Sequence, residues 1–184
     1  MKSVAIVLFP DVQSLDVAGP LDVFAEANRF VPQGEGYQIV TIGAAPYPIL
    51  ASNGMPLGAQ YDLADAPKQF DIVLVPGGPS LPESAEMPHI TAWLNEVTPL
   101  AGRYGSICTG AFILGHARLL DDKQAATHWS HAQQLADLFP KARVEPDRIY
   151  VRDGKLMTSA GVTAGIDMAL ALVAEDHGPA ISLA

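Results

Sequence analysis

Cysteine is almost absent from this sequence. Of 184 residues only one, Cys108, is a cysteine, so the chain has no internal disulfide and no zinc site built from several thiolates. A solitary cysteine is most often a small apolar residue of the core. Any chemical role for Cys108 therefore has to be argued from the residues around it.

Basic residues are also scarce. Eleven lysines and arginines stand against 20 aspartates and glutamates, which gives a formal net charge of −9 at pH 7. A surface of this sign repels the phosphate backbone of nucleic acids. We therefore expect this chain to make no contact with DNA by itself, so that any DNA contact requires a separate domain.

Long apolar runs are missing as well. No stretch reaches the roughly 20 apolar residues that a membrane-spanning helix needs. Met1-Lys2 leads directly into a strand-like run, without the apolar core and small-residue cleavage site of a secretory signal. The sequence predicts a cytoplasmic protein with no membrane partner.

Short apolar runs alternate with helical patterns along the chain. Each run ends at a proline, a glycine or a polar turn, as expected for strands buried on both faces. This alternation predicts one α/β domain over residues 1–184, with a parallel sheet and helices on both of its faces. The predicted strands are Val4–Phe9, Ile39–Ile42, Ile72–Val75 and, more weakly marked, Tyr104–Ile107. The predicted helices are Pro20–Arg29, beginning at its proline, Pro88–Val97, Ala111–Ala117, Ser130–Leu138 and Thr163–Glu175.

Two pairs of an amide or acidic residue followed by glycine predict β-hairpins beside the main sheet. Such pairs adopt the positive φ angles that tight hairpin turns need. The two hairpins are Ile49–Leu57, turning at Asn53-Gly54, and Ile149–Thr158, turning at Asp153-Gly154.

The last residues of the sequence contain the start of a further helix. Gly178 ends the preceding helix and Pro179 opens the next, but only five residues follow, about one turn. One turn is too short to sustain itself. We expect the sequence to be part of a longer chain; a frayed natural tail is the alternative.

The surroundings of Cys108 are those of a nucleophile at a strand-to-helix turn. Tyr104–Ile107 runs directly into Cys108, and the small residues 109–111 permit a tight turn into the next helix. This places the thiol at the carboxyl edge of the sheet, where α/β proteins bind ligands. Because the first N–H groups of a helix favour a thiolate, we expect a lowered thiol pKa. The alternative is a cysteine that only packs at a helix start.

Two glycines follow the predicted strand Ile72–Val75. Because Gly77 and Gly78 have no side chain, their backbone can approach a ligand, and their N–H groups can face a developing negative charge. The N–H groups of Gly78 and Thr109 are predicted to form an oxyanion hole. A tight turn without any role in binding is the alternative.

An acidic loop follows the first predicted strand. In a parallel sheet this loop reaches the same edge as Cys108, so Asp16 is the predicted acid, base or hydrogen-bond partner of the thiol. Asp11 and Asp22 are its competitors for that role. A capping role for Asp16 is the alternative.

Histidine, the usual base for a catalytic thiol, does not adjoin Cys108. His128 and Trp129 follow a short edge strand and are expected, with Gly77, to line the ligand pocket, but spacing does not settle whether His128 reaches the sulfur. Thr163, in a run of small residues before a helix, is placed at the rim of that pocket. No metal or other cofactor is predicted, because the remaining histidines lack ligand spacing and are assigned to the surface or to caps; they are His89, His116, His131 and His177.

Taken in order, these segments resemble the ThiJ/PfpI superfamily, which has the class I glutamine-amidotransferase-like fold. The resemblance implies a flavodoxin-like sandwich with a mostly parallel central sheet and helices on both faces. It also implies a cysteine at the nucleophile elbow and a homodimer. The segments that carry it are Leu15–Pro20, Val75–Gly78, Ser106–Ala111, Ala126–Trp129 and Thr158–Asp167.

Two groups within this superfamily are similar to the chain. Residues 147–161 and 175–178 are most similar to the N-terminal amidase-like domain of AraC-type transcriptional regulators, which precedes a helix-turn-helix DNA-binding domain. Asp16 and the pair Cys108-Thr109 are similar to isocyanide hydratase, which adds water to an isocyanide to give an N-formamide. Peptidase-like members carry histidine directly after the cysteine, where this chain has Thr109, which argues against peptidase activity.

The resemblance therefore implies two functions. The favoured one is a sensor: the pocket around Cys108 binds a small molecule, and a C-terminal helix-turn-helix domain beyond residues 1–184 contacts DNA. The alternative is a hydratase in which Cys108 attacks the isocyanide carbon and Asp16 manages the proton. In that reaction the N–H groups of Gly78 and Thr109 stabilise the intermediate.

Overall fold

A seven-stranded sheet forms the centre of the computed structural model, which describes residues 1–85 and 87–184. The strand order is β10-β11-β7-β6-β1-β2-β5, and every neighbouring pair is parallel except β10 and β11. The predicted mostly parallel sheet is therefore confirmed. Its strands are β1 (Lys2–Leu8), β2 (Tyr37–Gly43), β5 (Tyr61–Asp62), β6 (Ile72–Val75), β7 (Arg103–Ile107), β10 (Tyr150–Asp153) and β11 (Leu156–Ser159).

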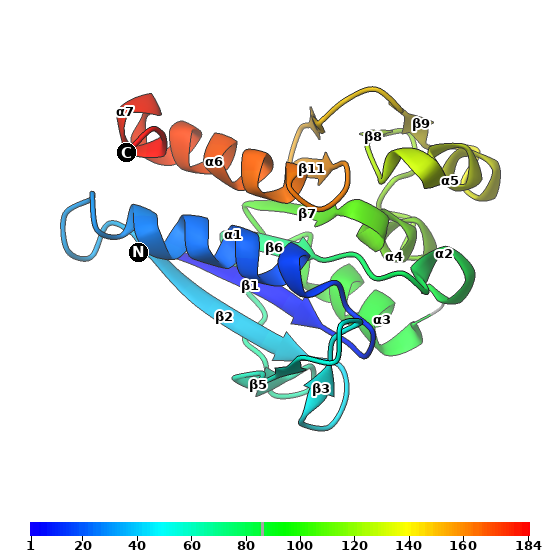
Figure 1. Cartoon of the computed structure of the whole chain (residues 1–184), viewed down its shortest axis with the longest axis horizontal. Coiled ribbons are helices and arrows are strands. Elements are labelled where there is room, and N and C mark those ends of the chain that lie inside the picture. The colour runs from blue at the N-terminus through cyan, green and yellow to red at the C-terminus, as the bar shows by residue number, and fades with distance from the viewer. Residues whose placement is uncertain (86) are drawn as a thin grey trace.

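Helices cover both faces of this sheet. Figure 1 shows α1 and α6 side by side over one face, with α3 and α4 on the other. The predicted three-layer arrangement is therefore confirmed. The helices are α1 (Ser14–Ala27), α2 (Leu81–Ser84), α3 (Pro88–Val97), α4 (Ala111–His116), α5 (Ala132–Leu138), α6 (Ala164–His177) and α7 (Pro179–Ser182), with the 3-10 turns η1 (Cys108–Gly110) and η2 (Trp129–His131).

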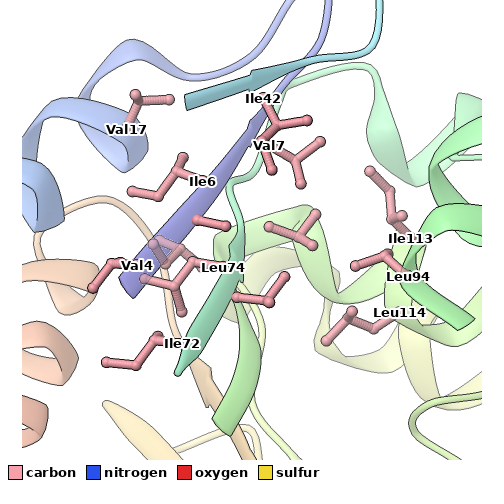
Figure 2. Close-up of a cluster of buried hydrophobic side chains, with 14 of the residues drawn as sticks. Val4, Ile6, Val7, Val17, Ile42, Ile72, Leu74, Leu94, Ile113 and Leu114 are labelled. Atoms are coloured by element: carbon pink, nitrogen blue, oxygen red, sulfur yellow. The ribbon is translucent and has the colours of Figure 1, made fainter. Parts of the chain in front are cut away.

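The core lies on the two sides of the central strands. Residues 4–8 of β1 are at most 1% exposed, because helices cover them from both directions. Figure 2 shows Ile6 and Val7 on opposite sides of β1, with Val17 of α1 on the side of Ile6 and Leu94 and Ile113 of α3 and α4 on the other. This double burial explains why the central strands are continuous apolar runs rather than alternating ones.

Helix α1 begins earlier than the sequence pattern suggests. The expected start at Pro20 is wrong: the helix begins at Ser14, and Pro20 lies inside it. A proline in a helix leaves the carbonyl four residues earlier without its usual N–H donor. At this point α1 lies close against α6, since a Cβ on Gly19 would lie 2.8 Å from Ile166 Cγ1. The consequence is that Asp16 stands in the first turn of a helix rather than in a loop.

Both predicted hairpins are present. Strands β3 (Ile49–Leu50) and β4 (Pro56–Leu57) pair antiparallel, as do β10 and β11. Gly54 and Gly154 adopt positive φ angles of 82° and 64° in the connecting turns. A further small sheet joins β8 (Gln124–Ala125) and β9 (Arg143–Val144) in parallel. Within the described residues, no helix has the length and apolarity needed to cross a bilayer.

The amino ends of three strands converge on Asp176, near the end of α6. Arg103 donates two hydrogen bonds to its carboxylate, at 2.8 and 2.7 Å, and the Tyr37 hydroxyl donates a third at 2.8 Å. Lys2 forms an ion pair with the same group. Burial alone would raise the pKa of Asp176, but the hydrogen bonds from Arg103, Lys2 and Tyr37 hold it below its ordinary value. We call these four residues the Asp176 cluster.

Candidate functional site

Cys108 occupies a strained turn at the carboxyl end of β7. Its φ angle is +55°, a left-handed conformation that residues other than glycine rarely adopt. Its N–H donates to the carbonyl of Ala160 at 3.1 Å, and its own carbonyl accepts from Thr127 Oγ1 at 2.9 Å. The chain then enters η1 and α4. The thiol therefore sits where the sequence predicts it, at a strand-to-helix turn over the sheet edge.

Asp16 lies beside this turn and is fully buried. Its side chain is inaccessible to solvent, and Oδ2 accepts a hydrogen bond of 3.0 Å from the Gly77 N–H. A Cβ on Gly77 would lie 2.8 Å from Asp16 Oδ2 and equally 2.8 Å from Cys108 Cβ, so all three residues meet at one point. Among the described residues, Asp16 Oδ1 has no hydrogen-bond partner of ordinary geometry.

The two aspartates that competed with Asp16 lie elsewhere. The Asp11 N–H donates to the carbonyl of Leu50 at 2.9 Å, which ties this part of the loop to the β3–β4 hairpin. Asp22 lines a separate hollow between α1 and α6. The structure thus brings Asp16, and neither competitor, together with the thiol.

Burial shifts the pKa values of both groups upward. The pKa of Asp16 rises to about 7 because of burial, although the Gly77 N–H and the Cys108 side chain partly counteract the rise. Burial, and then the charge of Asp16, raise the pKa of the Cys108 thiol to about 11 against weaker effects of the Thr109 and Val162 N–H groups. The expected lowering of the thiol pKa is therefore wrong. Burial by elements distant in the chain raises the thiol pKa more than the N–H groups of the short turn after Cys108 lower it.

The two N–H groups predicted to form an oxyanion hole are engaged inside the protein. The Gly78 N–H donates to Thr109 Oγ1 at 2.9 Å, and the same hydroxyl donates to the Gly78 carbonyl at 2.7 Å. The Thr109 N–H lies near the Cys108 sulfur, where it lowers the pKa of the thiol. The oxyanion hole stays a prediction, and it requires the Thr109 side chain to rotate away from Gly78.

A cavity of about 180 Å³ opens over the thiol. Of the predicted pocket residues, His128 lines this cavity, and Gly77 lies beside it, between Asp16 and Cys108. Trp129 is 74% exposed, and Thr163 is exposed beside the lining residue Val162. The lining residues are Gln13, Gly78, Pro79, Cys108, Thr109, His128, His131 and Val162.

His128 presents a neutral ring to this cavity. Its Nδ1 contacts Ser130 Oγ at 2.7 Å and accepts from the Ser130 N–H at 3.4 Å. Burial and then the neighbouring His131 lower the pKa of His128. Gly161 permits the position of the ring, since a Cβ there would lie 2.1 Å from His128 Cδ2. Within the described part of the chain, no hydrogen bond links His128 to the sulfur.

Four lining residues were not predicted from the sequence: Gln13, Pro79, His131 and Val162. Gln13 belongs to the loop that carries Asp16, and Val162 belongs to the run of small residues assigned to the rim. His131, assigned above to the surface, shares the turn η2 with Trp129 and follows His128 by three positions. That spacing was the available signal, because residues three apart on a helical turn share a face.

A larger hollow of about 390 Å³ lies away from the thiol, between α1, α6 and α7. Its lining is mainly apolar, and it contains no thiol or imidazole; the members include Leu15, Val23, Phe30, Ile166, Leu170 and Ile181. The Cys108 cavity is smaller, but it combines a thiol, two imidazoles and a nearby carboxyl. We therefore take it as the candidate site. No group of three or more His, Cys, Asp or Glu side chains suited to a metal occurs in residues 1–85 and 87–184.

The fold and this site define an α/β domain with a cysteine at a nucleophile elbow and a buried acidic partner. The DJ-1/PfpI family matches residues 2–175, and the chain belongs to that family. The resemblance inferred from the sequence is confirmed.

Known relatives include both of the predicted functional groups. Isonitrile hydratase from Pseudomonas putida is 36% identical over 174 residues, which cover 94% of this chain and 71% of that protein. The HTH-type transcriptional regulator CdhR from Pseudomonas aeruginosa is 31% identical over 176 residues, or 96% of this chain and 51% of the regulator. The chain thus spans about half the length of that regulator.

Solved structures show the same fold. The crystal structure of an AraC family transcriptional regulator from Pseudomonas putida has a TM-score of 0.88 and 22% identity. The match covers 100% of this chain and 96% of that chain.

Proposed function

We propose that this chain is the small-molecule-sensing domain of an AraC-type transcriptional regulator. The observation that carries the proposal is the alignment of 96% of the chain with only 51% of the regulator CdhR. Such a ratio is expected when a ligand-binding domain is joined to a DNA-binding domain of similar size. The ligand site is the cavity over Cys108.

The state of the site supports binding rather than attack on a substrate. With its pKa raised to about 11, the thiol is protonated at neutral pH, and a thiol is a weaker nucleophile than a thiolate. The Gly78 N–H already bonds Thr109 Oγ1. The cavity of about 180 Å³ is below the roughly 300–1,000 Å³ of drug-sized sites, so the ligand is a small molecule.

DNA contact belongs to a separate C-terminal domain in this proposal. The formal net charge of −9 leaves the sensing domain unsuited to a phosphate backbone. We also propose that the chain forms a homodimer, as the family resemblance implies. Light scattering coupled to size-exclusion chromatography measures its mass directly, and a monomer at micromolar concentration would contradict this part.

A hydratase is the second candidate, and Asp16 is the observation that favours it. Burying a carboxyl with one oxygen unpartnered costs free energy, and a binding pocket does not need such a group. A pKa of about 7 is suited to a general base at neutral pH. The 36% identity with an isonitrile hydratase points in the same direction.

The chemistry of that second function can be written with the residues present. Asp16 takes the proton of the Cys108 thiol while the sulfur forms a bond to the terminal isocyanide carbon, and that proton completes the resulting thioimidate. Water then adds to the same carbon, the carbon–sulfur bond breaks, and the products are an N-formamide and the regenerated thiol. No oxidant or reductant is needed.

One experiment separates the two functions. Wild type, Cys108→Ser and Asp16→Asn are mixed with a small alkyl isocyanide, and formamide is followed by proton NMR; melting temperatures are recorded with a panel of small ligands. A sensor gives no formamide, and a ligand raises the wild-type melting temperature more than that of Cys108→Ser. A hydratase gives formamide that both substitutions abolish. Turnover that survives Cys108→Ser would show that the nucleophile is misplaced.

A further inference from the structure

The backbone of Cys108 is held from two sides. A left-handed conformation at a residue with a Cβ costs free energy, so it persists only where the surroundings fix it. The first contact is the 3.1 Å bond from the Cys108 N–H to the Ala160 carbonyl. The second is the 2.9 Å bond that Thr127 Oγ1 donates to the Cys108 carbonyl.

The bond from Thr127 differs from the other bond to that carbonyl. The Ala111 N–H also donates to the Cys108 carbonyl, but it belongs to the same turn and moves with it. Thr127 lies on the segment that follows β8, a separate part of the chain. Its hydroxyl therefore fixes the turn relative to the rest of the domain.

Thr127 is itself firmly placed. Its side chain is 2% exposed, and the neighbouring Ala126 N–H donates to Thr158 Oγ1 at 2.7 Å. Thr158 is fully buried on β11, where it pairs with Ser106 of β7, the strand that leads into Cys108. Thr127 is thus anchored, through Ala126 and Thr158, to β7, the same strand that leads into Cys108.

We infer that Thr127 is a positioning residue, whose hydroxyl holds Cys108 in the conformation that directs its sulfur into the cavity. The inference rests on the proposed site at Cys108, but it is the same for a sensor and for a hydratase. Thr127 also directly precedes His128, so one short segment sets both a wall of the cavity and the position of its thiol.

Replacing the hydroxyl while keeping the shape isolates this role. Thr127→Val removes the donor, and the Ala111 N–H still satisfies the Cys108 carbonyl, so the fold is retained. Without the hydroxyl, Cys108 relaxes towards negative φ and its sulfur moves away from Asp16 into a less buried place. Thr127→Ser keeps the donor. Thr98→Val, at a buried threonine after α3, is the matched control.

The readout is the pH dependence of iodoacetamide alkylation, followed by intact mass, in which Cys108 is the sole thiol. We expect Thr127→Val to raise the rate at pH 7 by about threefold or more and to lower the pH midpoint, because the thiol pKa moves towards its ordinary value. Thr127→Ser and Thr98→Val should stay within about twofold of wild type. Crystal structures should show positive φ at Cys108 in Thr127→Ser and negative φ in Thr127→Val.

Two results would overturn the inference: a Thr127→Val profile equal to wild type, or a Thr127→Ser profile that departs as far as that of valine. If Thr127→Val does not unfold cooperatively, Thr127→Ala replaces it with the same expected rate and midpoint. Failure of the proposed function is a separate result. In that case no ligand changes the melting temperature and no formamide forms, while the alkylation profiles still decide the role of Thr127.

Discussion

Two buried aspartates stand at opposite edges of the same sheet, and their pKa values move in opposite directions. Asp16, at the carboxyl edge, is fully buried with one oxygen unpartnered, and its pKa rises to about 7. Asp176, at the amino edge, has a side chain 5% exposed, and its pKa falls below the ordinary value. The two side chains are both largely shielded from solvent, yet their pKa values shift in opposite directions.

The two pKa values differ because the two carboxyl groups have different hydrogen-bond and ion-pair partners. Asp176 receives hydrogen bonds from Arg103 and Tyr37 and pairs with Lys2, so its negative charge is compensated. Asp16 receives one N–H bond from Gly77 and otherwise faces the Cys108 thiol, which is neutral at pH 7. Removing a partner from a compensated buried carboxylate is costly, whereas an uncompensated carboxyl can exchange a proton near neutral pH. The contrast separates a carboxylate that is held charged from a carboxyl that can exchange a proton near neutral pH.

The largest expected effect comes from removing the charge of Asp176. Asp176→Asn removes the carboxylate that accepts two hydrogen bonds from the largely buried guanidinium of Arg103, which keeps only its 3.2 Å contact with the partly exposed Glu175. Breaking one partner of a buried pair typically costs about 3–5 kcal/mol. Urea unfolding at pH 7 should therefore show a loss of free energy of unfolding in this range. A loss below about 1 kcal/mol would mean that the Asp176 cluster contributes no more than a surface pair does.

Asp16→Asn should alter how the free energy of unfolding depends on pH. Because the folded pKa is about 7 against an ordinary 3.8, the folded state holds a proton that the unfolded state releases between these values. Wild-type stability should thus fall relative to Asp16→Asn as pH rises from about 4 to about 7, by on the order of 3 kcal/mol, and then level off. Denaturant unfolding of both proteins across this range measures the difference, and parallel curves would contradict it.

The alkylation rate of Cys108 tests the effect of the uncompensated carboxyl of Asp16 on its neighbour. With a pKa near 11, Cys108 should react with iodoacetamide at pH 7 at least about tenfold more slowly than a free thiol, because less thiolate is present. Asp16→Asn removes the neighbouring charge and should raise the rate about threefold. Mass spectrometry of the alkylated protein gives both rates. A wild-type rate above that of free cysteine would restore the expectation of an activated thiolate.

The smallest effect should come from an exposed carboxylate. Glu96 pairs with Lys68 at 2.8 Å, and its side chain is 61% exposed, so water screens the interaction. Glu96→Gln should change the free energy of unfolding by less than about 0.5 kcal/mol in the same urea experiment. A loss comparable to that of Asp176→Asn would show that burial is not what distinguishes the Asp176 cluster.

Local patterns were sufficient to predict most elements of the fold. The strand Ile72–Val75 and the helix Pro88–Val97 match the structure residue for residue, because an apolar run and an N-terminal proline are local signals. The start of α1 could not be found in this way. A proline normally marks a first turn, but here Pro20 lies inside a helix that packs closely against α6 at Gly19, a tertiary contact that the local pattern does not contain.

The meeting of Asp16 with Cys108 was predictable because parallel strands present their carboxyl ends at one edge. The sign of the thiol pKa shift was not, since it depends on burial by elements distant in the chain. The same holds for the Gly78 N–H, which bonds the Thr109 hydroxyl 31 positions away. Sequence spacing locates a site, whereas its protonation state follows from tertiary packing.

The Asp176 cluster joins parts of the chain that are almost as far apart as the sequence allows. Lys2 and Asp176 are 174 positions apart, and Tyr37 and Asp176 are 139 apart. Because closing loops of this length costs entropy, we expect these contacts to form late in folding. Substitutions in the cluster should therefore accelerate unfolding and leave the folding rate almost unchanged. We therefore expect the cluster to affect how long a folded molecule survives rather than how quickly it forms.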